Sequence, residues 1–404
     1  MVAFKSLQDL LALETTTGKV VLVREDLNVP MRDGQVTDDT RLRRAVPTLD
    51  MLAGAGFKVV VLAHFGRPKG QVVPDMSLRP VATALNTLTQ ATTHFYGETI
   101  GAGAQTAIDA MNAGQILVLE NSRYLPGEEK NDAALAQELA SLGDYFVSDA
   151  FSASHRAHVT TEGLAHHLPS FAGLLMAEEL EALHKVLGQP IRPVVAIVGG
   201  SKISTKLDLL SNLIDKVDTL VIGGGMANTF LQASGVDVGQ SLAEPDLAPT
   251  ALDILAKADR QGCRIMLPSD VVVADAIDAG DSSIVVPATA VPSDKMILDF
   301  GPNSAQAVVD IIEQAETLIW NGPLGAFEFA PFEQATMKVA HAVAAQTTSG
   351  ALVSVAGGGD TVSALGMAGA VDQMTYVSSA GGAFLEWMEG KELPGVKALA
   401  RSSA

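Results

Sequence analysis

The sequence predicts an α/β protein built from two doubly wound parallel sheets, and two observations carry this prediction. Short β-branched runs recur along the whole chain, each followed by glycine or polar residues and then by a stretch with helical spacing of its apolar residues. Such alternation is typical of parallel strands joined by crossover helices that cover both faces of a sheet. The length, 404 residues, exceeds what one hydrophobic core usually serves, so we expect two domains.

The expected strands alternate with crossover helices. Residues 40–56 and 204–217 carry apolar residues three and four apart, which is typical of amphipathic helices. Residues 171–188 have the pattern of a further helix, which should end at Gly188 because Pro190 and Pro193 follow. The runs expected to contain strands span residues 19–26, 57–66, 115–123, 144–151, 193–200, 218–225, 263–270, 316–323, 351–360 and 374–382.

A helical linker should divide the two domains, because the stop after residue 188 is the best candidate boundary in the chain. We expect an N-terminal domain over residues 1–172, a linker helix over 173–189 and a C-terminal domain over 190–389. Residues 390–404 form a short tail that Pro394 interrupts. No motif recurs at a fixed period and no low-complexity tract occurs, which argues against solenoids and propellers.

Charge and composition exclude several classes of protein. The net charge of −19, from 46 acidic and 27 basic residues, repels nucleic acid and anionic membranes. No apolar stretch is long enough for a transmembrane helix, and acidic residues within the first apolar stretch argue against a secretory signal. The single cysteine, Cys263, suits a reducing cytosol, so we expect a cytoplasmic protein.

In the first half, basic and polar side chains follow the expected strands. Open α/β sheets bind their ligands at the carboxyl ends of the strands. Several arginines there suit a small ligand with carboxylate and phosphate groups, because each guanidinium can donate two hydrogen bonds to such a group. A single arginine is usually a solvated surface residue, but their number weakens that interpretation. The side chains concerned belong to Arg24, Asp26, Asn28, Arg41, His64, Arg67, Asn121, Arg123, Asp149, His155, Arg156 and His158.

In the second half of the chain, the residues that follow the expected strands are mainly glycines. They let a phosphate approach the backbone N–H groups of a helix N-terminus, although glycine also serves close helix–strand packing. Neither G-x-G-x-x-G nor G-x-x-x-x-G-K-[ST] occurs, so each glycine pair alone is weak evidence. Lys202 and Lys206 stand four apart near the start of one expected helix, and should share a face and reach a polyphosphate. Asp360 could hold Mg²⁺ or act as a helix N-cap. The glycines are Gly199, Gly200, Gly223, Gly224, Gly225, Gly322, Gly357, Gly358, Gly359, Gly381 and Gly382.

One half thus fits a small anion and the other a nucleotide, which together predict phosphoryl transfer between two domains that close on each other. A nucleotide-binding oxidoreductase is an alternative, but its dinucleotide fingerprint is absent. A metal-dependent hydrolase is a second alternative, with Arg156 among its candidate ligands His155, His158, His166 and His167 and no cysteine near them. A catalytically inactive binding protein on the same fold is a third.

The chain is similar to phosphoglycerate kinases from end to end. The resemblance implies two Rossmann-like domains joined by a helical hinge, the N-terminal one for phosphoglycerate and the C-terminal one for nucleotide. It also implies a monomeric, Mg²⁺-dependent enzyme of glycolysis. Such an enzyme transfers a phosphoryl group reversibly between 1,3-bisphosphoglycerate and ADP, giving 3-phosphoglycerate and ATP, by direct in-line transfer after hinge closure. The matching stretches are VREDLNVP (23–30), DDTRLR (38–43), HFGRP (64–68), LENSRYLPGEE (119–129), DAFSASHRAH (149–158), GGSKISTK (199–206), GGGMANTF (223–230), WNGPLGAFE (320–328), GGGDT (357–361) and SSAGGAFLE (378–386).

The resemblance also implies roles by position. Phosphoglycerate would be held by Asp26, Asn28, Arg41, His64, Arg67, Arg123 and Arg156. The reacting end would be served by Arg41, Lys202, Gly381 and Gly382, with Lys202 following the migrating phosphoryl group. The nucleotide would contact Lys206, Asn321, Pro323, Glu328, Gly358, Gly359, Asp360 and Thr361, with Asp360 facing the metal ion. The tail over residues 390–404 would pack back on the N-terminal domain.

Two positions depart from the usual pattern of that family. Ala380 stands where many members have the first of three glycines. If this position requires a positive φ, alanine would strain the loop by about 1 kcal/mol or more, and the inactive alternative would gain support. Ser152 replaces a usual glycine, whereas the neighbouring His155 and Arg156 still match.

Overall fold

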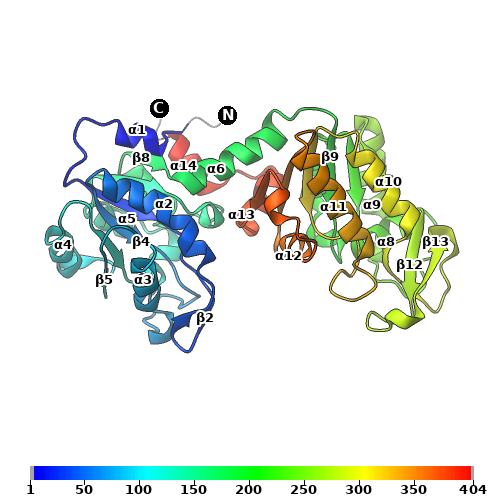
Figure 1. The fold of residues 1–404 in the computed structure, drawn as a ribbon, viewed down its shortest axis with the longest axis horizontal. Helices are drawn as coiled ribbons and strands as arrows, with labels where there is room; N and C mark the ends of the chain where they lie inside the picture. Colours follow the sequence, from blue (N-terminus) through cyan, green and yellow to red (C-terminus); the bar gives the residue numbers. More distant parts are fainter. Residues whose placement is uncertain (1–3, 402–404) are drawn as a thin grey trace. The chain divides into compact units, whose positions relative to one another are not determined.

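A computed structural model describes residues 4–401, which form two compact units (Figure 1). The first unit contains the described residues up to Glu181 and from Glu392 onward, and the second contains Ala182–Lys391. Each unit is built around a six-stranded sheet in which all neighbouring strands are parallel, so the predicted fold class is confirmed. Within residues 4–401, no helix is long and apolar enough to span a membrane.

The first sheet has the strand order β5-β6-β4-β1-β7-β8. Four of its strands lie in runs that the sequence predicts. The other two, β5 and β8, have the sequences THFY and SFA, which are not β-branched apolar runs, so the sequence pattern did not mark them. The strands are β1 (Val20–Arg24), β4 (Lys58–Leu62), β5 (Thr93–Tyr96), β6 (Ile116–Leu119), β7 (Tyr145–Ser148) and β8 (Ser170–Ala172).

Alternate residues of this sheet face two layers of helices. Val21 and Val23 of β1 belong to one apolar core together with Leu49, whereas Leu22 belongs to the core that contains Ile108. Burying one such side chain contributes about 1.5–3 kcal/mol, so both faces of the sheet hold their helices firmly. The helices are α2 (Thr40–Gly54), α3 (Arg79–Asn86), α4 (Gly101–Asp109) and α5 (Ala133–Ala140), with α1 (Leu7–Leu11) and the hairpin β2 (Met31–Arg32), β3 (Gln35–Val36) beside them.

The second sheet has the order β11-β10-β9-β15-β16-β17, and all six strands lie in predicted runs. They are β9 (Val194–Val198), β10 (Thr219–Ile222), β11 (Arg264–Met266), β15 (Thr317–Asn321), β16 (Val353–Gly357) and β17 (Tyr376–Ser378). The helices of this unit are α7 (Leu207–Ile214), α8 (Gly224–Ala233), α9 (Ala248–Gln261), α10 (Pro302–Ile312), α11 (Gln334–Thr348), α12 (Gly359–Met367) and α13 (Gly382–Met388).

A small antiparallel sheet, absent from the sequence-based prediction, is inserted between β11 and β15. Its strands β12 (Asp270–Ala274), β13 (Ile284–Pro287) and β14 (Met296–Phe300) pair in the order β13-β12-β14. One face packs on α8 through a separate apolar cluster that includes Leu231 and Val273. The insert matters for function because β14 supplies a wall of the cavity described below.

One helix leads from the first unit into the second. α6 (Leu174–Leu183) continues as a π-helical turn over His184–Gly188, and the boundary between the units falls within α6. After α13 the chain returns to the first unit as α14 (Pro394–Arg401), where the backbone N of Gly395 donates to the carbonyl of Ser154 at 2.9 Å. Ala398 of α14 belongs to the apolar core that contains Leu22. Residues 402–404 of the predicted tail lie outside the described residues.

Candidate active site

The first half-site lies where the connections of the first sheet diverge. After β1 the chain crosses to β4 on one side, and after β7 it continues to β8 on the other side, although β1 and β7 are neighbours. Loops that leave adjacent carboxyl ends in opposite directions open a crevice between them. The side chains that follow these two strands are therefore the ones that a ligand can reach.

Asp26 joins both sides of this crevice. Its Oδ2 accepts a hydrogen bond of 2.7 Å from Nη1 of Arg41, in the first turn of α2, and one of 2.5 Å from Oγ of Ser152, which follows β7. Its Oδ1 accepts a bond of 3.2 Å from the backbone N of Asn28. Burial acts to raise the pKa of Asp26, but the charge of Arg41 and the bond from Ser152 outweigh it and hold the pKa below its usual value. Asp26 is thus an ionised acceptor.

A second chain of hydrogen bonds connects Asn28 to Arg123. Asn28 Oδ1 accepts from the backbone N of Gly66 at 3.0 Å, and the Gly66 carbonyl accepts from Nη1 of Arg123 at 2.8 Å. Gly66 has φ +59°, a conformation that favours glycine, and a Cβ there would lie 2.9 Å from Sδ of Met76, whose flexible side chain would have to move. The loops after β1, β4 and β6 are fixed to one another by these bonds.

His64 is held by the buried Arg24. Its Nδ1 lies 2.8 Å from Nη2 of Arg24, and because a guanidinium only donates, Nδ1 accepts and Nε2 carries the proton. Burial, followed by the charges of Arg24 and Arg123, lowers the pKa of His64 well below its usual value. Burial and Arg123 likewise lower the pKa of His158 to about 4. Both rings are neutral near pH 7, as expected in a strongly positive potential that an anion would relieve.

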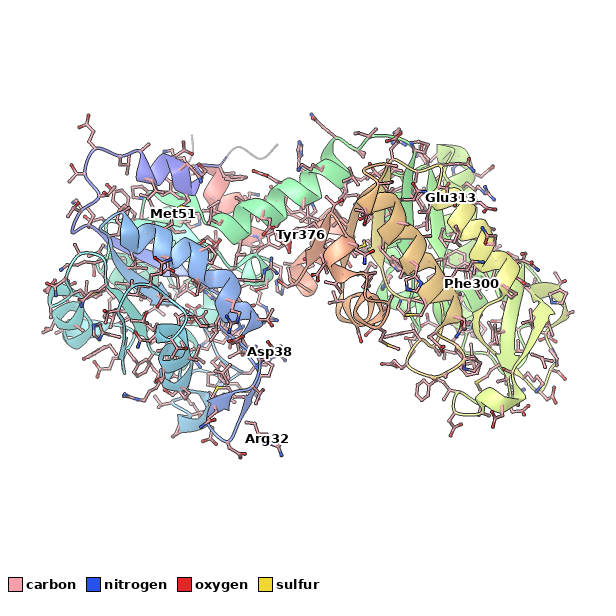
Figure 2. All side chains as sticks on the ribbon, viewed as in Figure 1. Arg32, Asp38, Met51, Phe300, Glu313 and Tyr376 are labelled. Atoms are coloured by element: carbon pink, nitrogen blue, oxygen red, sulfur yellow. The ribbon has the colours of Figure 1, made fainter. Side chains whose placement is uncertain are left out.

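The remaining predicted residues of this half-site are less tightly joined. Arg67 is exposed, and Arg156 donates from Nε to Nε2 of the neighbouring His155 at 3.1 Å. In the described part of the chain, no hydrogen bond connects either residue to Asp26. A cavity of about 470 Å³ lies beside the group, and Figure 2 shows Asp38, one of its lining residues, near the start of α2. It is lined by Asn28, Val29, Pro30, Asp38 and Arg41.

The second half-site lies at the corresponding point of the second sheet, between the loops after β9 and β15. Several of its glycines serve close packing of these loops. A Cβ on Gly199 would lie 1.8 Å from the Pro323 carbonyl oxygen, and one on Gly224 would lie 2.6 Å from the Gly200 carbonyl oxygen. Gly359, in contrast, has no atom within 4 Å of a Cβ position, so its surroundings leave room for a ligand.

Lys206 ties these loops together. Its Nζ donates to the carbonyl oxygen of Gly199 at 2.7 Å, to that of Asn321 at 3.2 Å and to Oδ1 of Asn321 at 2.5 Å. Burial lowers the pKa of Lys206 to about 8, although Asp360 acts against this. The Asn321 amide also donates to the Gly357 carbonyl at 2.7 Å, and Oγ1 of Thr361 accepts from the Gly322 backbone at 2.7 Å. Three predicted nucleotide residues are therefore held in one network.

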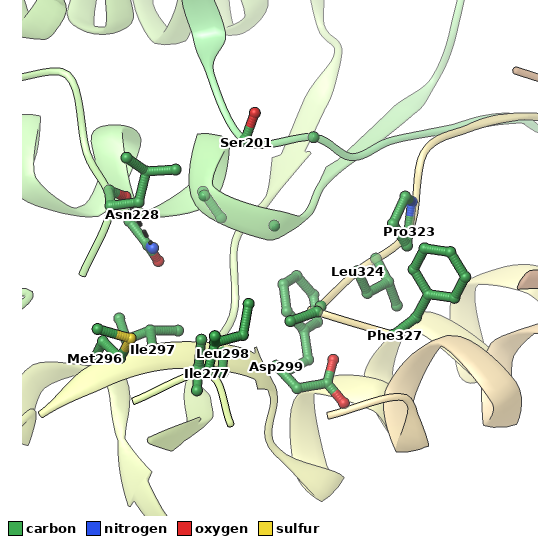
Figure 3. A pocket seen from close by; sticks show the side chains of 18 of the residues that line it. Ser201, Asn228, Ile277, Met296, Ile297, Leu298, Asp299, Pro323, Leu324 and Phe327 are labelled. Atoms are coloured by element: carbon green, nitrogen blue, oxygen red, sulfur yellow. Dashed lines mark hydrogen bonds between the residues drawn. The ribbon is translucent and has the colours of Figure 1, made fainter. Parts of the chain in front are cut away.

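An apolar cavity of about 600 Å³ adjoins this network. Figure 3 shows the side chains of β14 and of the loop after β15 on its walls, among them Met296, Leu298, Pro323 and Phe327. Glu328 and Asp360, both exposed, also line it. Apolar walls with a few polar groups at the edge are typical of sites for small molecules.

The structure corrects the expected placement of Lys202 and Lys206. The two residues do not share a helix face, because α7 begins only at Leu207 and a 3₁₀ turn over Ile203–Thr205 separates them. Glu244 holds this turn by accepting from the backbone N of Ser204 at 3.0 Å and from its hydroxyl at 2.6 Å. Lys202 is left exposed on the loop.

Asp360 is the second residue of α12, whose N-cap is Gly358, so it does not act as the N-cap. One exposed carboxylate at a helix start fits a Mg²⁺ ion that is also bound by phosphates and water. Within residues 4–401, no three His, Cys, Asp or Glu side chains gather closely enough to hold a metal ion. The candidate ligands of the hydrolase alternative, His155, His158, His166 and His167, therefore form no such group.

The backbone at Ala380, where the sequence departs from the usual family pattern, is not strained. In the described part of the chain, the non-glycine residues with a positive φ are Asp33, Lys69 and Asn131, and Ala380 is not among them. The positive φ of this loop, +49°, falls on Gly381, which is the N-cap of α13 and has open space around it. Alanine at 380 therefore carries no backbone penalty here, and Gly381 retains the freedom that the loop needs.

Sequence reasoning missed most of the cavity wall. Leu242, Ile277, Met296 and Leu298 come from loops and from the small antiparallel sheet, and only the tertiary fold brings them together. An apolar run at residues 296–298 was an available signal for part of this wall. The sequence also gave no indication of the contact between Ser152 and Asp26, which are 126 positions apart.

Comparison with known proteins identifies the relatives of this chain. A family model described as phosphoglycerate kinase matches residues 10–391. The phosphoglycerate kinase of Sinorhizobium fredii is 60% identical over 98% of both chains, and that of Zymomonas mobilis is 57% identical over 98% of this chain and 99% of its own. A solved phosphoglycerate kinase structure from Coxiella burnetii matches with a TM-score of 0.92 at 42% identity, covering 100% of both chains. One from Pyrococcus horikoshii matches with a TM-score of 0.80 at 28% identity, covering 99% of both.

Proposed function

This chain belongs to the phosphoglycerate kinase family, whose members are phosphotransferases, and on that basis we propose that it transfers a phosphoryl group reversibly between 1,3-bisphosphoglycerate and ADP. The products are 3-phosphoglycerate and ATP, as glycolysis requires. The observation that carries the proposal is the pair of unlike half-sites: a cationic crevice around Asp26 and Arg41 in one unit, and an apolar cavity beside Lys206 in the other. One fits a small anion and the other a nucleotide.

Phosphoglycerate binds in the first half-site. Its carboxylate and phosphate meet Arg41, Arg67, Arg123 and Arg156, while the neutral His64 donates from Nε2. Asp26 is a carboxylate acceptor and suits the hydroxyl of the ligand, which is its only neutral donor. Asn28 keeps the loop after β1 in register with Gly66.

The nucleotide binds in the second half-site. Its base lies in the apolar cavity beside Pro323, and Glu328 at the edge accepts from the ribose hydroxyls. Lys206 holds the phosphates, helped by the backbone of Gly358 and Gly359 and by the hydroxyl of Thr361 at the start of α12. Asn321 orients Lys206 by accepting from its Nζ.

Transfer is direct and in line. In the direction of ATP consumption, a carboxylate oxygen of 3-phosphoglycerate bonds to the γ-phosphorus as the bond to the β–γ bridging oxygen breaks, and ADP leaves. Lys202, exposed on its loop, offsets the charge of the migrating group together with Arg41 and the amides of Gly381 and Gly382. Asp360 would hold Mg²⁺, which neutralises phosphate charge when bound. We further propose that closure of the two units excludes water, and that the enzyme is a cytoplasmic monomer.

Separate titrations of 3-phosphoglycerate and ADP by calorimetry test the division into half-sites. Arg41→Ala should weaken 3-phosphoglycerate binding about 10-fold or more, because it removes a charged donor, and should leave ADP binding unchanged. Arg43→Ala, on the same helix but paired with Asp39 at the surface, is the matched control and should change neither. Equal losses for both ligands in Arg41→Ala would contradict the proposal.

A further inference from the structure

Ser152 contacts the acceptor at the centre of the first half-site. It lies in the 3₁₀ turn over Phe151–Ala153, directly after β7, and its Oγ donates to Oδ2 of Asp26 at 2.5 Å. The same oxygen accepts from Nη1 of Arg41 at 2.7 Å. Ser152 therefore connects the loop after β7 to the loop after β1 across the crevice of the first sheet.

The contact between Ser152 and Asp26 determines which of the two carboxylate oxygens of Asp26 can still accept a hydrogen bond from a ligand. An ionised carboxylate offers about two acceptor positions on each oxygen. Oδ2 fills both positions with Arg41 and Ser152, whereas Oδ1 uses one position for the backbone N of Asn28 at 3.2 Å. Among the described residues, one position on Oδ1 is left for a ligand.

We propose that Ser152 is a positioning residue that directs the substrate hydroxyl to Oδ1 of Asp26 and thereby adds to selectivity for a hydroxylated phospho-acid. The inference rests on the proposed binding of phosphoglycerate in this half-site. That ligand carries a carboxylate, a phosphate and one hydroxyl, and only the hydroxyl can donate to a carboxylate. Without the Ser152 hydroxyl, Oδ2 regains an open position, and the Asp26 carboxylate loses one of the three hydrogen bonds that hold its orientation.

The location supports this role over a purely structural one. The Asp26 side chain keeps 15% of its surface exposed, and Arg41, which it contacts, is 40% exposed and lines the cavity with Asn28. A hydroxyl that merely stabilised its own turn would bond within the turn, as Ser154 does by donating to the Phe151 carbonyl at 2.7 Å. Ser152 instead bonds to a residue 126 positions away.

The test compares two ligands that differ by the hydroxyl alone. Calorimetry measures the dissociation constants of 3-phosphoglycerate and of 3-phosphooxypropanoate, the same chain without the hydroxyl, for the full-length protein. Ser152→Ala should weaken 3-phosphoglycerate binding about 3- to 10-fold, the range of one hydrogen bond, and should change binding of the propanoate less than about 2-fold. Ser152→Gly lacks the same hydroxyl and should give the same pattern.

Ser154→Ala is the matched control, because it removes a buried hydroxyl from the same turn that has no contact with Asp26. It should leave the affinity ratio of the two ligands as in the wild type, and thermal melting of all variants identifies losses that come from unfolding. Equal weakening of both ligands in Ser152→Ala, or no weakening of either, would overturn the inference while the proposed function stands. Failure of the wild-type protein to bind 3-phosphoglycerate would overturn the proposed function itself.

Discussion

Replacing Asp299 by asparagine should make the second unit progressively more stable than the wild type as the pH rises. Asp299, on β14, is 1% exposed. Its Oδ2 accepts from the backbone N of Ala335 at 2.9 Å, near the start of α11, and its Oδ1 has no partner among the described residues. Burial, with a smaller effect of the Glu333 charge, raises the pKa of Asp299 from 3.8 to about 8.

The direction and magnitude of this pH effect on the free energy of unfolding follow from the proton that Asp299 retains in the folded state. Between pH 3.8 and about 8 the folded protein binds this proton and the unfolded chain does not, so the free energy of unfolding falls as the pH rises. One proton changes it by roughly 1.4 kcal/mol per pH unit. From pH 5 to pH 7 the wild type should therefore lose about 2–3 kcal/mol relative to Asp299→Asn, which keeps the acceptor for Ala335 and cannot ionise.

Urea unfolding followed by tryptophan fluorescence measures the difference in unfolding free energy between Asp299→Asn and the wild type. It reports on the second structural unit, because both tryptophans, Trp320 and Trp387, lie within Ala182–Lys391. The comparison is made at pH 5, 6, 7 and 8. Asp253→Asn replaces an exposed carboxyl on α9 and should leave the pH dependence of stability as in the wild type. Stability curves of Asp299→Asn and wild type that stay parallel from pH 5 to 8 would refute the reasoning.

Four further predictions address other features of the molecule. Lys202→Ala should lower kcat roughly 100-fold or more and change the Kd of ADP little, because its charge is needed most during transfer; equal losses in kinetics and calorimetry would contradict this role. Arg67→Ala should raise the KM for 3-phosphoglycerate about 10-fold and leave that for ATP nearly constant, whereas comparable rises would mean that the half-sites are divided wrongly. Ala380→Gly should reduce the free energy of unfolding by about 0.5–1 kcal/mol in urea, since Ala380 has no positive φ to relieve; a gain would show hidden strain. Burial, then Asp218 and Asp215, raises the pKa of Cys263 to about 11, so a disulfide reagent at pH 8 should react with the folded protein far more slowly than with the unfolded one, and equal rates would disprove this.

The parallel sheets could be predicted because each strand is a short apolar run with a clear end. Residues 194–198 and 353–357 illustrate this, since both are followed by glycine and a helical pattern. The carboxyl-edge rule then pointed to Asp26 and Arg41, which the structure joins by a direct bond. Strand β8, with the sequence SFA, lacks such a run. The antiparallel insert has β-branched runs at residues 271–273 and 284–286, but no helical pattern follows either run, so the rule used for parallel strands did not detect them.

Contacts between loops could not be predicted from the sequence, because they join residues that are far apart in the chain. The turn between Lys202 and Lys206 depends on Glu244, 40 positions from Ser204, so helical spacing placed these lysines wrongly. A glycine after a strand of the second half can serve either close packing of loops or ligand access, and the sequence alone does not distinguish these two roles. Gly199 is required by contact with the Pro323 backbone, whereas Gly359 leaves open space for a ligand.

A coupled assay of ATP consumption with 3-phosphoglycerate and Mg²⁺ tests the central claim most directly. We expect turnover that requires all three components, reverses when 1,3-bisphosphoglycerate and ADP are supplied, and is nearly lost in Lys202→Ala. Wild-type protein that binds both ADP and 3-phosphoglycerate by calorimetry but shows no turnover would contradict the claim that these half-sites form a phosphoryl-transfer enzyme.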